Sequence, residues 1–267
     1  MKNMTQKTIN DFGEQWERYT DDDGYYASLE YFDDILEPLQ SSQDYKGQTV
    51  LDIGSGSGRI VNMILDAGAK HIFALEPAKA AFETLKQNTK DRAEKITYLN
   101  SQGDEIPKDV SVDRIVSMGV LHHIPDPDPV MTAAYSALKP KGTCLAWLYG
   151  KEGNGLYLSL VNPLRAITTR IPHFLLSLLC HVLNAFLYLY ILGCFILPLP
   201  MHKYAKKVLW NLNHQKRYLV IYDQLNPAYA KYYTKKEAMN LFEKAGFKDV
   251  QIHHRHGYSW TVLGTKE

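Results

Sequence analysis

A glycine-rich stretch follows one short apolar run and precedes a second apolar pattern of helical period. Residues 52–58 read DIGSGSG, directly after the apolar residues Val50 and Leu51. Glycines let the chain turn sharply and bring backbone N–H groups against a ligand. The positive end of a helix that begins there favours an anionic group such as a carboxylate. The spacing therefore predicts a ligand site between a strand and a helix.

The residues on either side of this loop favour one kind of ligand. The dinucleotide fingerprint G-x-G-x-x-G fails here because Arg59 occupies the position of its third glycine. Asp52 precedes the loop, where a pyrophosphate would meet a like charge. A ligand with both an ammonium and a carboxylate fits better, and the amino-acid part of S-adenosylmethionine has both. We therefore favour this cofactor over NAD.

A second acid follows the next predicted strand, 71–75. Glu76 lies roughly twenty residues beyond the loop, the spacing at which an acid accepts hydrogen bonds from ribose hydroxyls. An exposed acid at a strand end is the alternative for Glu76 alone. Together with the loop, the ribose interpretation is the stronger one.

Five segments in order resemble the successive motifs of class I S-adenosylmethionine-dependent methyltransferases. They read VLDIGSGSG, ALEP, NSQGDEIP, DRIVSMGVLHHIPDPDPVM and LKPKGTCLAWLYG. The similarity is close over 49–150 and looser over the final helix and hairpin. It implies a Rossmann-like α/β fold, with a seven-stranded, mostly parallel sheet and helices on both faces.

The resemblance also assigns cofactor contacts at the ends of the first four strands. Asp52 is expected near the ammonium and Glu76 at the ribose. Gln102 replaces the usual carboxylate beside the adenine, so the neighbouring Asp104 is the alternative for that contact. The full predicted set is Asp52, Gly54, Ser55, Gly56, Gly58, Glu76, Pro77, Gln102, Gly103, Asp104, Met118 and Gly119.

Many relatives also fold an N-terminal aromatic residue over the cofactor, which makes Trp16 and Tyr19 candidates. Packing of an amphipathic helix explains both aromatics at least as well. Asp11 is expected to cap a helical turn just before them.

Three residues near the predicted acceptor position are candidates for catalysis. A general base helps methyl transfer when the acceptor is a hydroxyl. His122 and His123 follow the fourth strand, and Tyr149 ends the fifth, at the edge where α/β proteins bind ligands. A structural role for the histidine pair is the favoured alternative, because LHHI occurs in relatives of varied chemistry.

Composition excludes several other classes of function. The net charge of +1 gives no general affinity for nucleic acid. The three cysteines show no CxxC spacing, and the histidines at 253, 254 and 256 lack an identifiable third ligand, so no metal is expected. A polar N-terminal segment predicts cytoplasmic synthesis.

An apolar segment interrupts the α/β alternation. No formally charged residue occurs between Ile171 and Met201, and 174–200 is long enough to cross a bilayer. A single crossing would place the last helix and hairpin on the wrong side of the membrane. Pro172 and Pro198 bound the segment and Gly193 is expected to break it into two helices. It is predicted to be a lid, a membrane-surface element or an interface between copies of the chain.

These observations predict three parts: an N-terminal helical cap at 1–44, a core at 45–150 and 226–267, and the apolar helical insertion at 151–225. The expected function is methyl transfer from S-adenosylmethionine to a small, hydrophobic or lipid-linked acceptor, with oxygen favoured over carbon or nitrogen. A peripheral location on the cytoplasmic membrane would fit the insertion. The alternatives are a non-catalytic, membrane-associated binding module and, less favoured, an NAD-dependent oxidoreductase.

Overall fold

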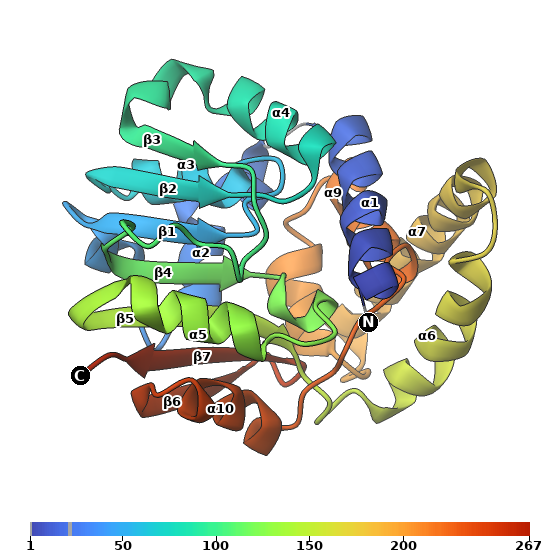
Figure 1. Ribbon diagram of the computed structural model, residues 1–267. Helices are drawn as coiled ribbons and strands as arrows, with labels where there is room; N and C mark the ends of the chain where they lie inside the picture. Colours follow the sequence, from blue (N-terminus) through green and yellow to red (C-terminus); the bar gives the residue numbers. More distant parts are fainter. Residues whose placement is uncertain (1, 21–22) are drawn as a thin grey trace.

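The computed structural model describes residues 2–20 and 23–267, and its centre is one seven-stranded sheet (Figure 1). The strand order is β3-β2-β1-β4-β5-β7-β6. The first five strands in that order are parallel, whereas β7 is antiparallel to both β5 and β6. The predicted fold class is confirmed. The strands are β1 (Thr49–Ile53), β2 (His71–Leu75), β3 (Ile96–Leu99), β4 (Val112–Met118), β5 (Leu138–Tyr149), β6 (Lys248–Arg255) and β7 (Ser259–Thr265).

Helices cover both faces of this sheet, so its central strands are apolar on both sides. In β1, Val50 belongs to one core cluster and Leu51 to the other, because successive side chains of a strand point to opposite faces. The second cluster also contains Phe242 from the last helix. The helices and helical turns of this part are α3 (Arg59–Asp66), α4 (Lys79–Asn88), η3 (Lys90–Lys95), η4 (Leu121–His123), α5 (Asp128–Ala137) and α10 (Lys235–Lys244).

The N-terminal part begins with α1 (Lys2–Arg18), followed by η1 (Gly24–Ala27), α2 (Leu29–Leu36) and η2 (Ser42–Tyr45). In Figure 1, α1 stands at the edge of the sheet where the parallel strands end; it packs on α4 and is hydrogen-bonded to α9 (His214–Leu225). The prediction that Asp11 caps a turn is wrong, because α1 runs through this residue. Its carboxylate instead accepts a 3.0 Å hydrogen bond from the Ala228 N–H, which joins α1 to the chain after α9.

The segment between β5 and α10 forms a helical layer beyond the ends of the parallel strands (Figure 1). Besides α9, it contains α6 (Gly155–Thr168), α7 (His173–Ile196), α8 (His202–Tyr204) and the π-helical turn η5 (Ala205–Leu209). The predicted break at Gly193 is wrong, because α7 continues to Ile196. A Cβ atom on Gly193 would lie 3.4 Å from the Cδ1 of Leu199, so this glycine makes room for the returning chain.

Candidate active site

The glycine loop between β1 and α3 is held by the end of the neighbouring strand. The backbone N–H groups of Gly54 and Ser55 both donate to the Leu75 carbonyl, at 2.8 and 3.0 Å. Gly54, Gly56 and Gly58 all have positive φ angles, which favour glycine. A Cβ on Gly54 would also lie 2.5 Å from the Cγ2 of Val120. The predicted cofactor residues of this loop therefore share one tight turn before α3.

The Asp52 carboxyl lies buried beneath this loop and is only 1% exposed. In the described part of the chain, neither of its carboxylate oxygens has a hydrogen-bond partner. Burial raises the pKa of the Asp52 carboxyl to about 7. A buried carboxylate without a partner is costly, and a ligand ammonium would relieve that cost. The Asp52 carboxylate therefore fits the ammonium group in the amino-acid part of S-adenosylmethionine.

Glu76 links the loop to the start of α4. Its Oε2 accepts a 2.9 Å hydrogen bond from the Gly56 N–H, and its Oε1 accepts one of 2.8 Å from the Ala78 N–H. Burial raises the pKa of the Glu76 carboxyl to about 7. Each oxygen can accept a second hydrogen bond, as a ribose hydroxyl would require. Asn100, which the sequence reasoning missed, donates a 2.8 Å hydrogen bond to the Glu76 carbonyl and a longer one to that of Pro77.

Helix α1 lies over the glycine loop. A Cβ on Gly56 would be 3.2 Å from the Nε1 of Trp16, so the indole lies against this glycine. Asn88 of α4 joins the two segments, because its side chain donates to the carbonyls of Thr20, at 2.9 Å, and Ser57, at 3.0 Å. Tyr19 shares a 2.7 Å hydrogen bond with Tyr218 of α9, and its contact with the cofactor stays a prediction.

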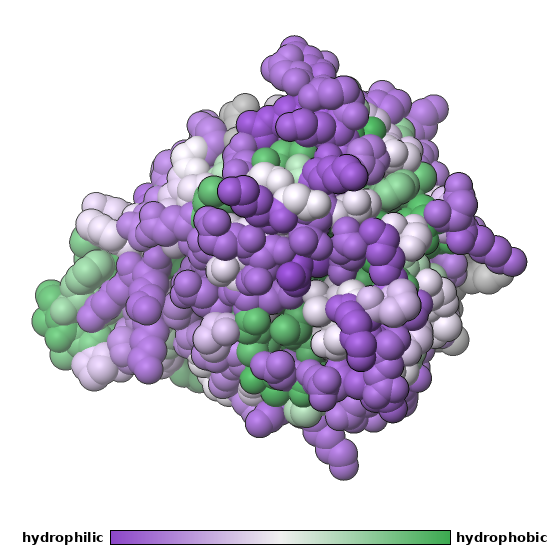
Figure 2. All heavy atoms as spheres, turned by 90° about the vertical axis from the view of Figure 1, so that its left-hand side faces the viewer, coloured by the Kyte–Doolittle hydropathy of each residue, from purple (hydrophilic) through white to green (hydrophobic). Residues whose placement is uncertain are grey.

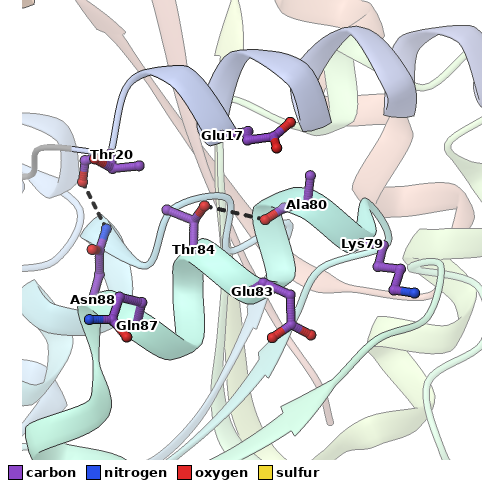
Figure 3. Close-up of a pocket in the computed structure, with 8 residues that line it drawn as sticks. All are labelled: Glu17, Thr20, Lys79, Ala80, Glu83, Thr84, Gln87 and Asn88. Carbon is purple, nitrogen blue, oxygen red and sulfur yellow. Dashed lines mark hydrogen bonds between the residues drawn. The ribbon is translucent and has the colours of Figure 1, made fainter.

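Figure 3 shows a groove between α1 and α4, and polar side chains from both helices border it. Thr84 donates a 3.2 Å hydrogen bond to the carbonyl of Ala80 and another of 3.2 Å to that of Trp16. None of the predicted cofactor residues lines this groove. Its lining residues are Glu17, Thr20, Lys79, Ala80, Glu83, Thr84, Gln87 and Asn88.

The remaining predicted cofactor residues occupy two further strand ends. After β3, Gln102 and Asp104 are exposed, whereas Gly103 is packed so tightly that a Cβ would lie 2.8 Å from the Cγ1 of Val130. Met118, the last residue of β4, is buried, and the N–H of the following Gly119 donates to the carbonyl of Trp147 at 3.3 Å. These placements leave the assignment of cofactor contacts a prediction.

The three candidate catalytic residues form one buried aromatic cluster. The His122 ring stacks on Tyr149 with centroids 3.7 Å apart, and His123 lies edge-on to the same tyrosine at 5.5 Å. The Phe12 ring of α1 packs against His123 from the other side, with centroids 4.7 Å apart. Their catalytic roles stay a prediction, but the structure brings all three residues together.

The two histidines differ in which ring nitrogen can accept a proton. Burial lowers the pKa of His123 to about 4 and that of His122 well below its usual value, so both rings are neutral near pH 7. His123 Nδ1 lies 2.8 Å from the Tyr229 carbonyl, which can only accept, so this nitrogen carries the proton. The lone pair of His123 is therefore on Nε2. His122 Nδ1 accepts from the Tyr149 N–H at 3.4 Å, which places its proton on Nε2 instead.

The insertion adds polar groups to this cluster that the sequence reasoning missed. The Gln224 side chain donates to the Tyr149 hydroxyl at 2.7 Å and accepts from the hydroxyls of Tyr157, at 2.9 Å, and Tyr232, at 2.8 Å. The buried Arg165 donates to Tyr232 at 3.0 Å. We call these five residues the Gln224 network. They are spread from β5 to the chain after α9, so no short motif could reveal them.

A third carboxyl group joins the N-terminal part to the insertion. Asp223 of α9 accepts a hydrogen bond from the Gln15 side chain of α1, and burial raises the pKa of this carboxyl to about 7.

The histidines at 253, 254 and 256 lie in and just after β6, and His256 pairs with Asp34 at 2.9 Å. Across residues 2–20 and 23–267, no three His, Cys, Asp or Glu side chains are grouped to hold a metal ion.

Comparison with known families identifies the part of the chain that carries this site. Residues 51–146 match the family model described as a methyltransferase domain, and this range includes the glycine loop, Glu76 and both histidines. The chain contains a methyltransferase domain. This match confirms the predicted class, and with it S-adenosylmethionine as the cofactor of the methyltransferase domain.

Two relatives show how far the sequence similarity extends. A ubiquinone biosynthesis O-methyltransferase of Hydrogenovibrio crunogenus is 24% identical over 59% of this chain and 65% of that protein. Phosphoethanolamine N-methyltransferase 2 of Caenorhabditis elegans is 31% identical over 45% of this chain and 28% of that protein. The chain thus spans less than two thirds of the length of either relative.

Solved structures share the fold of the methyltransferase domain over nearly the whole chain. The Burkholderia thailandensis 1,6-didemethyltoxoflavin-N1-methyltransferase, solved with 1,6-didemethyltoxoflavin and S-adenosylhomocysteine, has a TM-score of 0.54 at 14% identity and covers 98% of this chain and 86% of its own. A Thermotoga maritima S-adenosylmethionine-dependent methyltransferase has a TM-score of 0.52 at 15% identity, and the alignment covers 97% of this chain and 100% of that structure. At these identities the likeness establishes the fold alone.

Proposed function

We propose that this protein transfers a methyl group from S-adenosylmethionine to a small hydrophobic or lipid-linked acceptor, with oxygen as the favoured acceptor atom. One observation carries the cofactor side of this proposal: the Asp52 carboxylate is buried without a partner beneath the glycine loop. The name of the Hydrogenovibrio relative supports oxygen as the acceptor atom. The name of the Caenorhabditis relative, an N-methyltransferase, supports nitrogen as the alternative acceptor atom.

The residues of the site have separable roles in this reaction. The bound cofactor would supply a methyl group on a sulfonium, and an aligned nucleophile would attack the methyl carbon in line while the thioether leaves as S-adenosylhomocysteine. Asp52 would pair with the cofactor ammonium, Glu76 would accept from the ribose, and Trp16 of α1 would cover the loop. His123 Nε2 would take the proton from an acceptor hydroxyl, because burial keeps this ring neutral.

The insertion would act as the lid over the acceptor. Helices α6 and α9 supply Tyr157, Arg165 and Gln224 of the network around Tyr149. Buried polar groups that satisfy one another hold such a site rigid and exclude water. The apolar character of the insertion supports a hydrophobic acceptor, and a peripheral location on the cytoplasmic membrane is part of the proposal.

Calorimetry tests the cofactor assignment. We expect the protein to bind S-adenosylmethionine and not NAD. Gly56→Arg should abolish this binding because the new side chain would fill the space beside Trp16, and Glu76→Ala should weaken it. Glu83→Ala, at an exposed position on α4, is the matched control. Unchanged binding in both site variants would refute the assignment.

A labelled methyl group tests the reaction itself. The protein is incubated with S-adenosylmethionine carrying a labelled methyl and with a total lipid extract or a panel of small phenols. Transfer of label into an organic-soluble product would exclude the non-catalytic module and identify the acceptor class. Tight cofactor binding without transfer to any acceptor of these classes would instead favour that module.

A further inference from the structure

Helices α6 and α7 present a broad apolar surface to the outside of the molecule. Phe174, Leu178, Phe186, Leu189 and Ile196 of α7 are each more than 60% exposed, at intervals that place them along one side of the helix. Three further residues from α6 are exposed to the same degree: Leu156, Leu160 and Ile167. We call these eight residues the apolar face. Exposed apolar patches of this kind mark interaction sites.

The opposite side of α7 is packed on the domain along its whole length. Leu176 and Cys180 are buried against tyrosines of α9, and Ile191 and Cys194 belong to the main core. The Asn184 side chain donates a 2.9 Å hydrogen bond to the carbonyl of His214. By length and composition α7 could cross a membrane, and 22% of its most apolar 18-residue stretch is buried. If α7 crossed a membrane, it would lose these contacts with α9. Helix α7 is therefore suited to lie on a membrane surface.

The charges around the apolar face favour an anionic surface. Residues 153–222 contain seven Lys or Arg, of which Arg165 and Lys216 are buried, and no Asp or Glu, whereas the rest of the chain contains 23 Lys or Arg and 29 Asp or Glu. Arg170, between α6 and α7, and Lys203 and Lys207, after α7, are exposed. Lys206 lies 5.4 Å from the ring centroid of Phe195 in α7, so the basic cluster adjoins the helix. Basic residues near a bilayer are attracted to anionic headgroups.

Aromatic residues complete the features of a membrane-surface element. Tyr188 and Tyr190 of α7 are exposed, and so is Trp210 after η5. Such side chains concentrate at the boundary between headgroups and acyl chains. In Figure 1, α6 and α7 are on the right, whereas Figure 2 faces the left-hand side, where the surface is mostly hydrophilic. The molecule therefore has one side suited to lipid and another suited to water.

We infer that the apolar face, together with the exposed Arg170, Lys203 and Lys207, binds the surface of a bilayer that contains anionic lipids, with α6 and α7 lying in the headgroup boundary. The purpose of this contact rests on the proposed function. Helix α6 turns Leu156 and Leu160 outward while its Tyr157 and Arg165 belong to the Gln224 network. A hydrophobic acceptor dissolved in the bilayer would thus reach the Tyr149 cluster past the helices that contact the lipid.

Flotation with vesicles tests this inference on the full chain. Vesicles of phosphatidylcholine alone and of phosphatidylcholine mixed with phosphatidylglycerol are centrifuged with the protein, without cofactor or acceptor. We expect binding to the mixed vesicles that weakens as salt is added, because salt screens the charged contacts. Failure to float with either kind of vesicle at low salt would overturn the inference.

Two pairs of variants separate the apolar and basic contributions. Leu178→Ser and Phe186→Ser should each weaken vesicle binding about tenfold, since each removes a large apolar group from the contact. Lys203→Ala and Lys207→Ala should each weaken it about fivefold. The matched controls are Met4→Ser on α1 and the exposed pair Lys235→Ala and Lys236→Ala on α10, which should change nothing. Equal effects of the controls would contradict the inference.

Sedimentation without lipid distinguishes a bilayer from a second copy of the chain. A monomer that gains vesicle binding supports the inference. A stable dimer that Phe186→Ser dissociates, with no vesicle binding by the parent protein, would overturn it in favour of self-association. Calorimetry with S-adenosylmethionine on the same samples keeps membrane binding and methyl transfer apart, because loss of cofactor binding would count against the proposed methyl transfer alone.

Discussion

The Gln224 side chain on α9 donates a 2.7 Å hydrogen bond to the Tyr149 hydroxyl at the end of β5, across 75 positions of the sequence. The same amide oxygen accepts from Tyr157 and Tyr232. One side chain therefore holds three phenols in place, of which Tyr149 is buried. This contact makes the insertion part of the predicted acceptor site rather than a separate appendage.

Gln224→Leu should destabilise the protein without affecting the cofactor. The variant leaves three hydroxyls without their shared partner, and we expect the free energy of unfolding to fall by about 2–3 kcal/mol. Urea denaturation measures this loss, and Gln215→Leu, at an exposed position of the same helix, is the control. A variant as stable as the parent would show that the network contributes little.

Asp52→Asn should weaken S-adenosylmethionine and change its pH dependence. The folded-state pKa of Asp52 is raised from 3.8 to about 7, so the carboxylate that pairs with the ammonium forms only as pH rises through about 7. Cofactor affinity should increase over that range in the parent protein. In Asp52→Asn the affinity should be about tenfold lower, and its rise over that pH range should be smaller, because only Glu76, whose pKa is also raised to about 7, still titrates there. Calorimetry at several pH values is the measurement.

The same raised pKa makes a second prediction about the ligand-free protein. Between about pH 4 and 7 the folded state retains a proton on Asp52 that the unfolded state releases, so this group lowers stability as pH rises. Asp52→Asn should remove that loss and be more stable than the parent at pH 8, although it binds cofactor less well. Thermal unfolding at pH 5 and 8 compares the two. Equal pH dependence in both proteins would argue against a buried, unpaired carboxyl.

His123→Gln should reduce turnover and leave cofactor binding intact. If Nε2 takes the acceptor proton, its loss should lower kcat by about 10²–10⁴. Burial depresses the pKa of His123 to about 4, so protonation of this ring should not reduce the rate of the parent until pH approaches that value. His253→Gln, on the half-buried surface of β6, is the control. A normal kcat in His123→Gln would assign the histidine pair to packing.

Arg255→Met should break the contact between the C-terminal hairpin and α2 and lower the free energy of unfolding. The Arg255 guanidinium is buried and its Nε donates to the Asp34 carboxylate at 2.9 Å. Removing one partner of a buried pair costs about 3–5 kcal/mol. Although burial acts to raise the pKa of Asp34, His256 and Arg255 together lower it, so its stabilising effect should be lost only as pH falls below about 4. Lys86→Met, which breaks an exposed pair with Glu83, should cost far less in the same denaturation experiment.

Local patterns predicted much of the core because they reflect short-range physics. The alternation of apolar runs with helical periods predicts a doubly covered parallel sheet, and parallel strand ends must meet at one edge. That rule alone places Asp52, Glu76 and His123 at the same edge of the sheet. The Asp11 and Gly193 predictions were wrong because α1 runs through Asp11 and α7 runs through Gly193, so neither residue ends or begins a helix.

What the sequence determined by itself was the order of elements, the glycine loop with its two acids, and the methyltransferase class of the domain, since these depend on neighbouring residues. Only the tertiary structure decided that Trp16 lies against Gly56, that Tyr19 bonds to Tyr218, and that Gln224 bonds to Tyr149. It also decided which side of α7 is exposed. Such contacts join residues far apart in the chain, and their partners are chosen by packing and hydrogen-bond satisfaction that no local spacing records.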